Sequence, residues 1–354
     1  MFAFLRNLFG RAQDAPKVVA TPAATNPSAP PTTPVEPPTE PNSFDPVWAL
    51  LTVEDMPFPP RPSAEEAAQV AAIVPKVLAY YAEHRPDPAS FPALAMQIVQ
   101  MSHDPDLEMN ELARTIGMDP AISMHILRVA NSALYRRDLE IQDLRRAVLQ
   151  IGMREVGDIA SAVATRSLFD SDLKAEFEAF RPRWNRMFLD TMAVAFGASA
   201  FTFEQQAGRA EHAFLSGMFH DIGKSIALRA LAALTHGGRV ALPLAEGVVD
   251  EVLERVHVEI GGDLHLVWGL PDYLTRVCLR HHDFEIPASL EFRDIHNLRL
   301  VEGFHRLLLD PGDVRRLHET RQSLQAVELS YRSASRLYAD MKVQIERVQV
   351  MFSS

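Results

Sequence analysis

A histidine and an aspartate stand side by side in the segment FHDIGK, residues 219–224. His220 offers an imidazole and Asp221 a carboxylate, two groups that bind divalent metal ions, and an aspartate can bridge a pair of ions. Gly223 would let the chain turn here, and Lys224 could meet a phosphate group as a point charge. The segment is therefore the first candidate for a metal or phosphate site.

Two ligands do not close a metal site, so other donors are needed. Four more histidines follow downstream, at His257, His265, His281 and His282. The alternative is that these rings cap helices, or form hydrogen bonds that fasten neighbouring helices without a metal. The pattern by itself leaves both interpretations open.

Helices must position these side chains, because apolar residues recur at intervals of three and four along most of the chain. The first helix is predicted to begin after Ser63, a typical N-cap residue, with Glu65 and Glu66 in its first turn. Further helices are predicted at 92–102, 108–116, 120–131, 141–150, 153–168, 184–205, 208–219, 223–235, 246–268, 271–282 and 294–309. Because no alternating strand pattern is found, the predicted fold class is all-α.

The first 62 residues differ from the rest of the chain. Residues 1–12 are expected to form a short amphipathic segment with apolar side chains on one face and arginines opposite, which suggests peripheral membrane contact or partner docking through residues 2–9. The alternative is a terminus without a function. Residues 13–62 are rich in proline, alanine and threonine, and this composition predicts a disordered linker.

Residues 311–354 are predicted to form a C-terminal amphipathic helix. Eight residues between 324 and 348 follow a heptad spacing of three and four: Leu324, Val327, Tyr331, Ala334, Tyr338, Met341, Ile345 and Val348. Such a seam predicts a homodimer through a coiled coil over 324–348. The alternative is one long helix that packs on its own domain.

The amino-acid composition argues against several classes of protein. The formal net charge of -11 argues against nucleic-acid binding driven by phosphate contacts. The single cysteine, Cys278, excludes a disulfide within the chain and a cysteine-rich zinc site, and it favours a reducing, cytoplasmic location. No apolar run is long enough to predict a transmembrane helix.

Several longer motifs, in order, resemble the HDOD family, an HD-related group of signalling output domains. They are DPAISMHILRVANSALY at 119–135, IQDLRRAVLQIGMREV at 141–156, HDIGK at 220–224 and EVLERVHVEIGGDLHLVWGLPDYLTRVCLRHH at 251–282. The resemblance covers residues 84–290 and implies an HDOD-type domain of two packed helical subdomains, which we place at 63–310. Within it, we interpret Asn131 and Ser132 as a helix end rather than a catalytic pair.

The same resemblance implies a set of site residues. His220 and Asp221 match the HD pair, His257 the next ligand position, and His281 or His282 the one after it. Departures from the pattern of the HD-GYP cyclic-dinucleotide phosphodiesterases suggest a degenerate site. Asp190 stands where an upstream histidine belongs. The closing aspartate is missing between 298 and 308, where Gly303, Phe304 and His305 are found, and the HD-GYP specificity motif is absent after His282.

The resemblance therefore implies a bacterial signalling output or adaptor module that acts through contacts with signalling proteins and is not an enzyme. Asp190, His220, Asp221, Lys224, His257, His281 and His282 would form a remnant HD site with a ligand-binding role. No cofactor and no metal are expected; if a metal binds, its ligands would be His220, Asp221, His257 and His281. Two alternatives stay open: a metal-dependent phosphohydrolase acting on a nucleotide or cyclic dinucleotide, and a nucleotide sensor without hydrolysis that uses Lys224 and Arg280.

Overall fold

A computed structural model describes residues 47, 50, 63–87, 91–136, 140–169, 175–206, 208–310 and 317–352. All of them belong to one unit of the chain, residues 40–354. Every regular element among these residues is helical, which confirms the predicted all-α class. The predicted amphipathic segment at 1–12 and almost all of the predicted linker at 13–62 lie outside the described residues.

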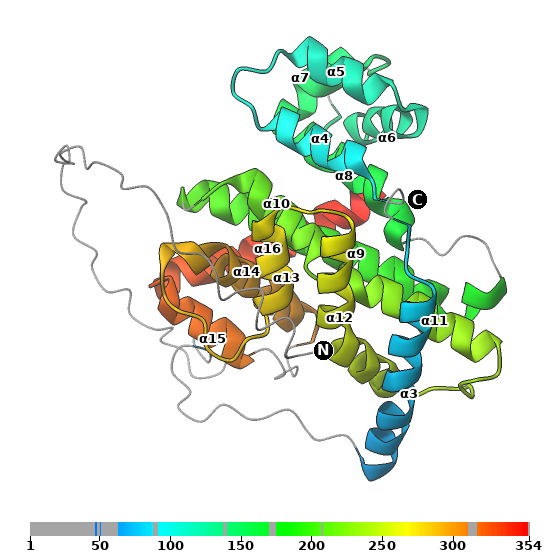
Figure 1. Cartoon of the computed structure of the whole chain (residues 1–354). Coiled ribbons are helices and arrows are strands. Elements are labelled where there is room, and N and C mark those ends of the chain that lie inside the picture. Colours follow the sequence, from blue (N-terminus) through cyan, green and yellow to red (C-terminus); the bar gives the residue numbers. More distant parts are fainter. Residues whose placement is uncertain are drawn as a thin grey trace, which may run out of the picture. The chain divides into compact units, whose positions relative to one another are not determined.

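The helices follow one another closely along the described chain (Figure 1). They are α3 (Ala64–Glu83), α4 (Ala93–Ser102), α5 (Met109–Gly117), α6 (Pro120–Ala130), α7 (Leu144–Ile151), α8 (Met153–Phe169), η2 (Ala175–Phe180), α9 (Arg181–Gln205), α10 (Ala210–Phe219), α11 (Ile222–His236), α12 (Glu246–Val267), α13 (Asp272–Arg280), η3 (Leu290–Phe292), α14 (Arg293–Leu309), α15 (Leu317–Ala326) and α16 (Tyr331–Phe352).

The predicted start of the first helix is confirmed. Ser63 is the N-cap of α3, and its side chain accepts a hydrogen bond from the Glu66 backbone while the Glu66 carboxylate accepts one from the Ser63 backbone. This reciprocal pair satisfies two of the amide groups that a helix start leaves open. The helix then buries Val70, Ile73 and Val77 at the spacing that the sequence shows.

Two groups of helices can be distinguished. Helices α4 to α7 pack on one another and around α8 (Figure 1). Helices α9 to α14 form the second group, in which α9 contacts α10, α14 and α16, while α11 contacts α12 and α3. The predicted arrangement of two packed helical subdomains is therefore confirmed.

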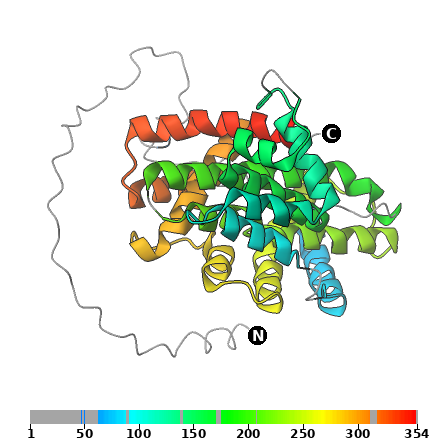
Figure 2. The same cartoon turned by 90° about the horizontal axis from the view of Figure 1, so that it is seen from above.

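The C-terminal segment forms two helices rather than the single one predicted. Residues 327–330 interrupt it, where Glu328 adopts a left-handed backbone with φ of 52°. Helix α16, drawn in red, runs alongside α9 in Figure 2. Along the predicted seam, Leu324, Ala334, Met341 and Val348 are buried within the chain. Because those side chains already pack on their own domain, the homodimer remains a prediction that would need another surface or a rearrangement.

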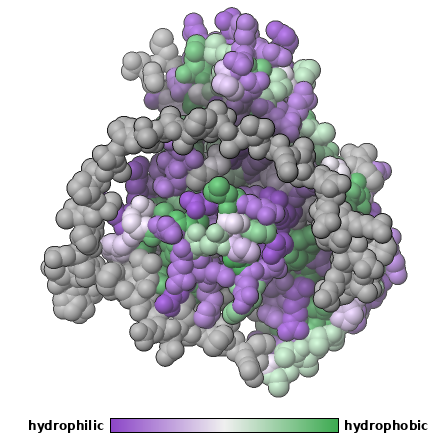
Figure 3. All heavy atoms as spheres, turned by 60° about the vertical axis from the view of Figure 1, so that its left-hand side comes forward, coloured by the Kyte–Doolittle hydropathy of each residue, from purple (hydrophilic) through white to green (hydrophobic). Residues whose placement is uncertain are grey.

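The visible surface carries both kinds of side chain. On the face drawn in Figure 3, hydrophilic residues prevail among the coloured atoms, with smaller hydrophobic areas between them. Among the described helices, none combines the length and apolar composition that a bilayer crossing requires.

Candidate metal centre

The HD pair lies at a junction between two helices. His220 is the C-cap of α10 and Asp221 is the N-cap of α11, so the chain turns where the two ligand types meet. Gly223, the second residue of α11, faces α12: a Cβ atom there would lie 2.0 Å from the carbonyl oxygen of His257. Glycine is therefore required at 223, because any side chain would push α11 away from α12 and separate Asp221 from His257.

Asp221 meets two histidines from other helices. Its Oδ1 atom lies 3.3 Å from His257 Nε2 and 3.4 Å from His281 Nε2. The two Nε2 atoms are themselves 3.4 Å apart. His282 adds a fourth donor, and one ligand atom from each of the four residues lies within 4.8 Å of every other. The structure thus brings together three of the four conditional metal ligands, and His282 joins them.

The outer nitrogens of the rings fix which nitrogen carries the proton. His257 Nδ1 lies 2.9 Å from the carbonyl oxygen of Glu254, and His281 Nδ1 lies 2.9 Å from that of Cys278. His220 Nδ1 lies 2.9 Å from the carbonyl oxygen of Gly217. A carbonyl only accepts, so each Nδ1 must donate, and in a neutral ring the Nε2 atom then presents a lone pair.

These lone pairs point at an acceptor rather than a donor. Asp221 Oδ1 and His220 Nε2 are buried and form no hydrogen bond within the described part of the chain. Lone pairs of imidazole and carboxylate that face one another without a proton repel, and a cation between them turns this repulsion into coordination. Metal-binding histidines commonly donate their other ring nitrogen to a carbonyl in this way. The donor set therefore fits a divalent metal ion.

The protonation states agree with this geometry. Burial lowers the pKa of His257 to about 3, with the Lys224 ammonium adding to the shift. Burial also lowers the pKa of His220. For Asp221, burial acts in the opposite direction, but the ammonium of Lys224 and the His220 and His257 rings hold its pKa well below its usual range. At neutral pH His220 and His257 are therefore neutral and Asp221 is a carboxylate, the forms that bind metal.

Helix α14 supplies a carboxylate that the sequence comparison overlooked. The expected aspartate is indeed absent, but Glu302 reaches the centre, and its Oε2 atom lies 3.9 Å from His220 Nε2. His220, Asp221 and Glu302 form a second group whose ligand atoms lie within 4.8 Å of one another. Attention to aspartate and to positions 303–305 missed it, because a glutamate one residue earlier carries the same group on a longer side chain. Glu302 thus offers a carboxylate on the part of α14, residues 298–308, where the sequence shows no aspartate.

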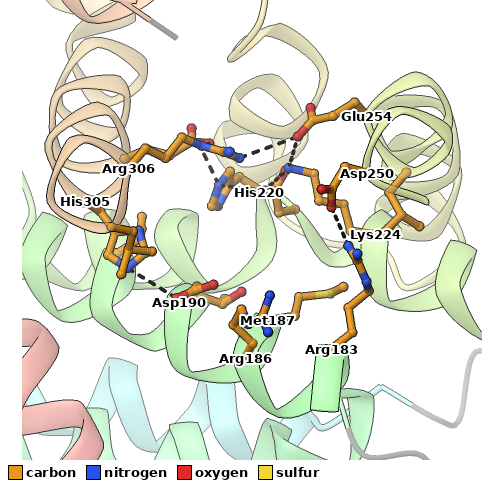
Figure 4. A pocket seen from close by; sticks show the side chains of 16 residues that line it. Arg183, Arg186, Met187, Asp190, His220, Lys224, Asp250, Glu254, His305 and Arg306 are labelled. Atoms are coloured by element: carbon orange, nitrogen blue, oxygen red, sulfur yellow. Dashed lines mark hydrogen bonds and ion pairs between the residues drawn. The ribbon is translucent and has the colours of Figure 1, made fainter. Parts of the chain in front are cut away.

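Asp190 lies on the wall of the adjoining pocket, outside both ligand groups. Its Oδ1 atom is 3.5 Å from Nε2 of His305, which also lines the pocket (Figure 4). Burial raises the pKa of Asp190 to about 6 and lowers that of His305 to about 4. The two residues thus form a protonatable pair beside the centre.

The pocket next to the centre is lined by charged side chains of both signs (Figure 4). Lys224 Nζ lies 2.6 Å from Asp221 Oδ2 and 3.0 Å from Glu254 Oε1. Arg306 lies 3.1 Å from Glu302 and 3.5 Å from Glu254. Arg183 pairs with Asp250, and Arg186 also borders the pocket.

Other residues singled out in the sequence have structural roles. The Asn131 side chain caps the end of α6, where its amide donates to the carbonyl oxygens of Leu127 and Ile141 and its oxygen accepts from the Ile141 backbone. Cys278 is buried, and burial raises the pKa of its thiol. Arg280 pairs with Asp283 at 2.8 Å and is not among the residues that line the pocket.

Comparison with known proteins identifies the motif core. A family model described as the HDOD domain matches residues 89–284. The chain is 24% identical over 243 residues to an uncharacterized protein of Treponema pallidum, and the match spans 67% of this chain and 45% of that protein. The chain therefore spans about half the length of that relative.

Solved structures share the fold. An HDOD domain protein of unknown function from Geobacter sulfurreducens superposes with a TM-score of 0.54 at 18% identity, covering 80% of this chain and 99% of that one. A Shewanella amazonensis SB2B protein described as a candidate metal-dependent phosphohydrolase gives 0.52 at 20% identity, with 78% and 99% covered. A Marinobacter aquaeolei VT8 protein described as a candidate signal transduction protein gives 0.53 at 15%, with 82% and 67% covered.

Proposed function

This chain belongs to the HDOD domain family, and from that premise we propose that it is a signalling module whose HD centre binds one divalent metal ion and an anionic ligand without hydrolysing the ligand. Contacts with a signalling protein carry its output. The sequence leads us to expect no metal, but it also names the ligands that would hold one if it binds. The metal part of the proposal follows this second possibility.

One observation supports the metal part above all others. Nε2 atoms of His257 and His281 and the Oδ1 atom of Asp221 converge, while the Nδ1 atoms of both rings face backbone carbonyls. When each ring carries its one proton on Nδ1, no proton joins the converging lone pairs. A divalent ion bound there would act as a Lewis acid and would orient an anionic group beside it.

The charge balance of the pocket supports an anionic ligand once the ion is bound. The lining includes four cationic side chains, Arg183, Arg186, Lys224 and Arg306, and five carboxylates, Asp190, Asp221, Asp250, Glu254 and Glu302. Without an ion, the carboxylates outnumber the cations by one. A divalent ion reverses this balance, so the bound form should attract phosphate-bearing ligands that the ion-free form repels.

The contacts of two carboxylates support a single bound ion, which argues against a two-metal hydrolase. Lys224 takes the second oxygen of Asp221 at 2.6 Å, and Arg306 lies 3.1 Å from Glu302. A pair of metal ions needs bridging carboxylates with open oxygens. Here Lys224 and Arg306 each hold one oxygen of these carboxylates, and the arrangement favours one ion over two.

Measuring metal uptake by the purified protein tests the first part of the proposal. Purified protein stripped with a chelator should take up about one equivalent of Co²⁺ or Mn²⁺, and the ion should raise the melting temperature by preferential binding to the folded state. Nucleotides and cyclic dinucleotides are then screened by thermal shift with and without the ion. A stripped protein that takes up neither ion at millimolar concentration would refute the metal part.

A phosphohydrolase with a single ion is the second candidate. It is favoured by Asp190, which faces the pocket and whose pKa is raised by burial to about 6, within the range of a general acid or base near neutral pH. The same Mn²⁺-loaded protein is incubated with bis-p-nitrophenyl phosphate and with a cyclic dinucleotide. Turnover that disappears in D190N would favour this candidate over the binding module.

The partner contact is tested separately. Pull-downs from bacterial extract with stripped and metal-loaded protein should recover a specific protein, and the recovered amount should depend on the ion if the centre controls the output. Recovery of the same background proteins by both forms, and by a variant that binds no metal, would argue against an adaptor role.

A further inference from the structure

His282 is held differently from its neighbours. His257 and His281 direct their Nδ1 atoms to backbone carbonyls of their own helices. The Nδ1 atom of His282 instead lies 3.2 Å from the carboxylate oxygen Oε2 of Glu319, a residue of α15. Both side chains are about one-fifth exposed. Because a carboxylate only accepts, Nδ1 donates, and in a neutral ring Nε2, which lies 4.0 Å from Glu254 Oε2, carries the lone pair that can face a metal ion.

Helix α15 is held closely against α14. A Cβ atom at Gly303 of α14 would lie 1.9 Å from the hydroxyl oxygen of Thr320, the residue that follows Glu319. Thr320 is 1% exposed. One turn further, the Ser323 hydroxyl lies 3.1 Å from His296 Nδ1. The glycine found in place of the expected aspartate thus allows the helix contact that brings Glu319 to His282.

Arg299 ties the same helix to the turn that carries the two histidines. Its side chain is almost fully buried, with 1% exposure. Its Nε atom donates to the carbonyl oxygen of His281 at 2.5 Å, a second nitrogen donates to that of Asp283, and a third donates to Gln322 of α15 at 2.8 Å. The turn and α15 are therefore fixed to one guanidinium, and Glu319 and His282 cannot easily move apart.

We propose that Glu319 is a positioning residue for the metal centre: it holds the His282 ring so that Nε2 becomes a fourth ligand beside Asp221, His257 and His281. This inference rests on the proposed metal binding. Carboxylates in this position fix the tautomer of a histidine ligand and raise its basicity. Glu319 lies outside the residues matched by the family model, 89–284, so the C-terminal segment adds to the centre of the family domain.

Co²⁺ alone is the probe, because imidazole and carboxylate bind it and its visible absorption reports coordination number. Stripped full-length wild type, E319Q and E319A are titrated with Co²⁺, and their melting temperatures are measured without metal. E319A should weaken Co²⁺ binding by at least about tenfold, E319Q by less, and both should change the absorption spectrum. The ion-free melting temperatures should stay close to that of wild type, since the pair is partly exposed.

Glu346→Gln, at an exposed position of α16, is the matched control and should bind Co²⁺ as wild type does. Equal Co²⁺ affinities and spectra for wild type and both Glu319 variants would overturn the inference while leaving the proposed metal binding intact. A lower ion-free melting temperature with unchanged affinity would overturn it too, because the residue would then be structural. Absence of Co²⁺ binding by wild type would refute the proposed function and the inference with it.

Discussion

Two buried clusters of histidine and carboxylate among the described residues look alike in composition and differ in where their ring nitrogens point. In the first, between α4, α8 and α10, His103 places Nε2 3.1 Å from Asp158 and Nδ1 3.7 Å from Glu211. In the second, the candidate metal centre, His257 and His281 place Nδ1 against backbone carbonyls and Nε2 against Asp221.

The difference lies in the direction of the lone pairs. Each ring nitrogen of His103 faces a carboxylate, and Nε2 forms a hydrogen bond with Asp158, so the ring already has acidic partners on both sides. In the candidate metal centre, each Nδ1 faces a backbone carbonyl, so neutral rings turn only acceptors toward Asp221 Oδ1. Buried histidines and acids therefore do not identify a metal site by their number; the partner of the outer nitrogen decides.

The largest effect is expected from removing the charge of Asp221, the carboxylate that both His257 and His281 face in the candidate metal centre. In D221N the amide retains the size of the side chain but loses the negative charge that attracts the ion. We expect Co²⁺ affinity to fall by more than about 100-fold, beyond the effect of losing a supporting residue, as measured by calorimetric titration. D158N, which alters the His103 cluster, should keep wild-type affinity; equal losses in both variants would show that the two clusters do not differ.

The His103 cluster should respond in stability instead. H103A leaves Asp158 buried without its partner, and burial already raises the pKa of that acid. We expect a loss of about 3 kcal/mol in the free energy of unfolding, measured by urea denaturation, with no change in Co²⁺ affinity. The double variant H103A/D158N should recover part of the loss because it removes the uncompensated charge. A double variant no more stable than H103A would contradict this account.

The sequence predicted the helices well, because their apolar spacing, as in Val70, Ile73 and Val77, directly records which face is buried. It missed the interruption at 327–330, since the apolar spacing continues through residues that leave the helix: Val327 is buried although α15 has ended. The left-handed backbone at Glu328 could not be predicted from its residue type, because residues other than glycine adopt this conformation only rarely.

The site was predicted in part. His220, Asp221, His257, His281 and His282 could be found, because motif spacing carries them. Glu302 and Glu319 could not, since their role depends on how α14 and α15 approach the centre rather than on any local pattern. The direction of each Nδ1 atom, which separates a metal site from a hydrogen-bonded cluster, likewise depends on the packing of whole helices.

A third buried histidine environment, around His125, differs from both clusters in the charge of its neighbours. Its Nδ1 atom lies 2.8 Å from the Arg128 guanidinium. Burial lowers its pKa to about 4, and Arg128 and Arg166 add to the shift. An environment this rich in positive charge excludes a metal ion, so the buried neutral ring should affect only stability.

The sign follows from the lowered pKa. The unfolded chain takes up a proton near the ordinary value of about 6.5, but the folded chain does so only near 4. Stability from this residue is therefore present above pH 6.5 and is lost as the pH falls toward 4. Between pH 7 and 5 the loss should be about 2 kcal/mol. Urea denaturation of H125Q should show a flatter pH dependence, whereas H84Q, at an exposed position, should follow wild type. A parallel curve for H125Q would contradict the assignment.

Lys224 gives the candidate metal centre a positive charge of its own, because its ammonium lies 2.6 Å from Asp221. If that charge competes with the ion, K224M should bind Co²⁺ at least about tenfold more tightly, since like charges in a buried site repel strongly. The same variant should bind a phosphate-bearing ligand more weakly, because a pocket cation is lost. K342M, at an exposed lysine of α16, is the control. Weaker Co²⁺ binding by K224M would mean that the ammonium helps to shape the site. Absence of Co²⁺ binding by both K224M and wild type would mean that the HD centre resembles the His103 cluster. It would then be a side-chain network whose positive charge comes from Lys224 and not from a metal ion.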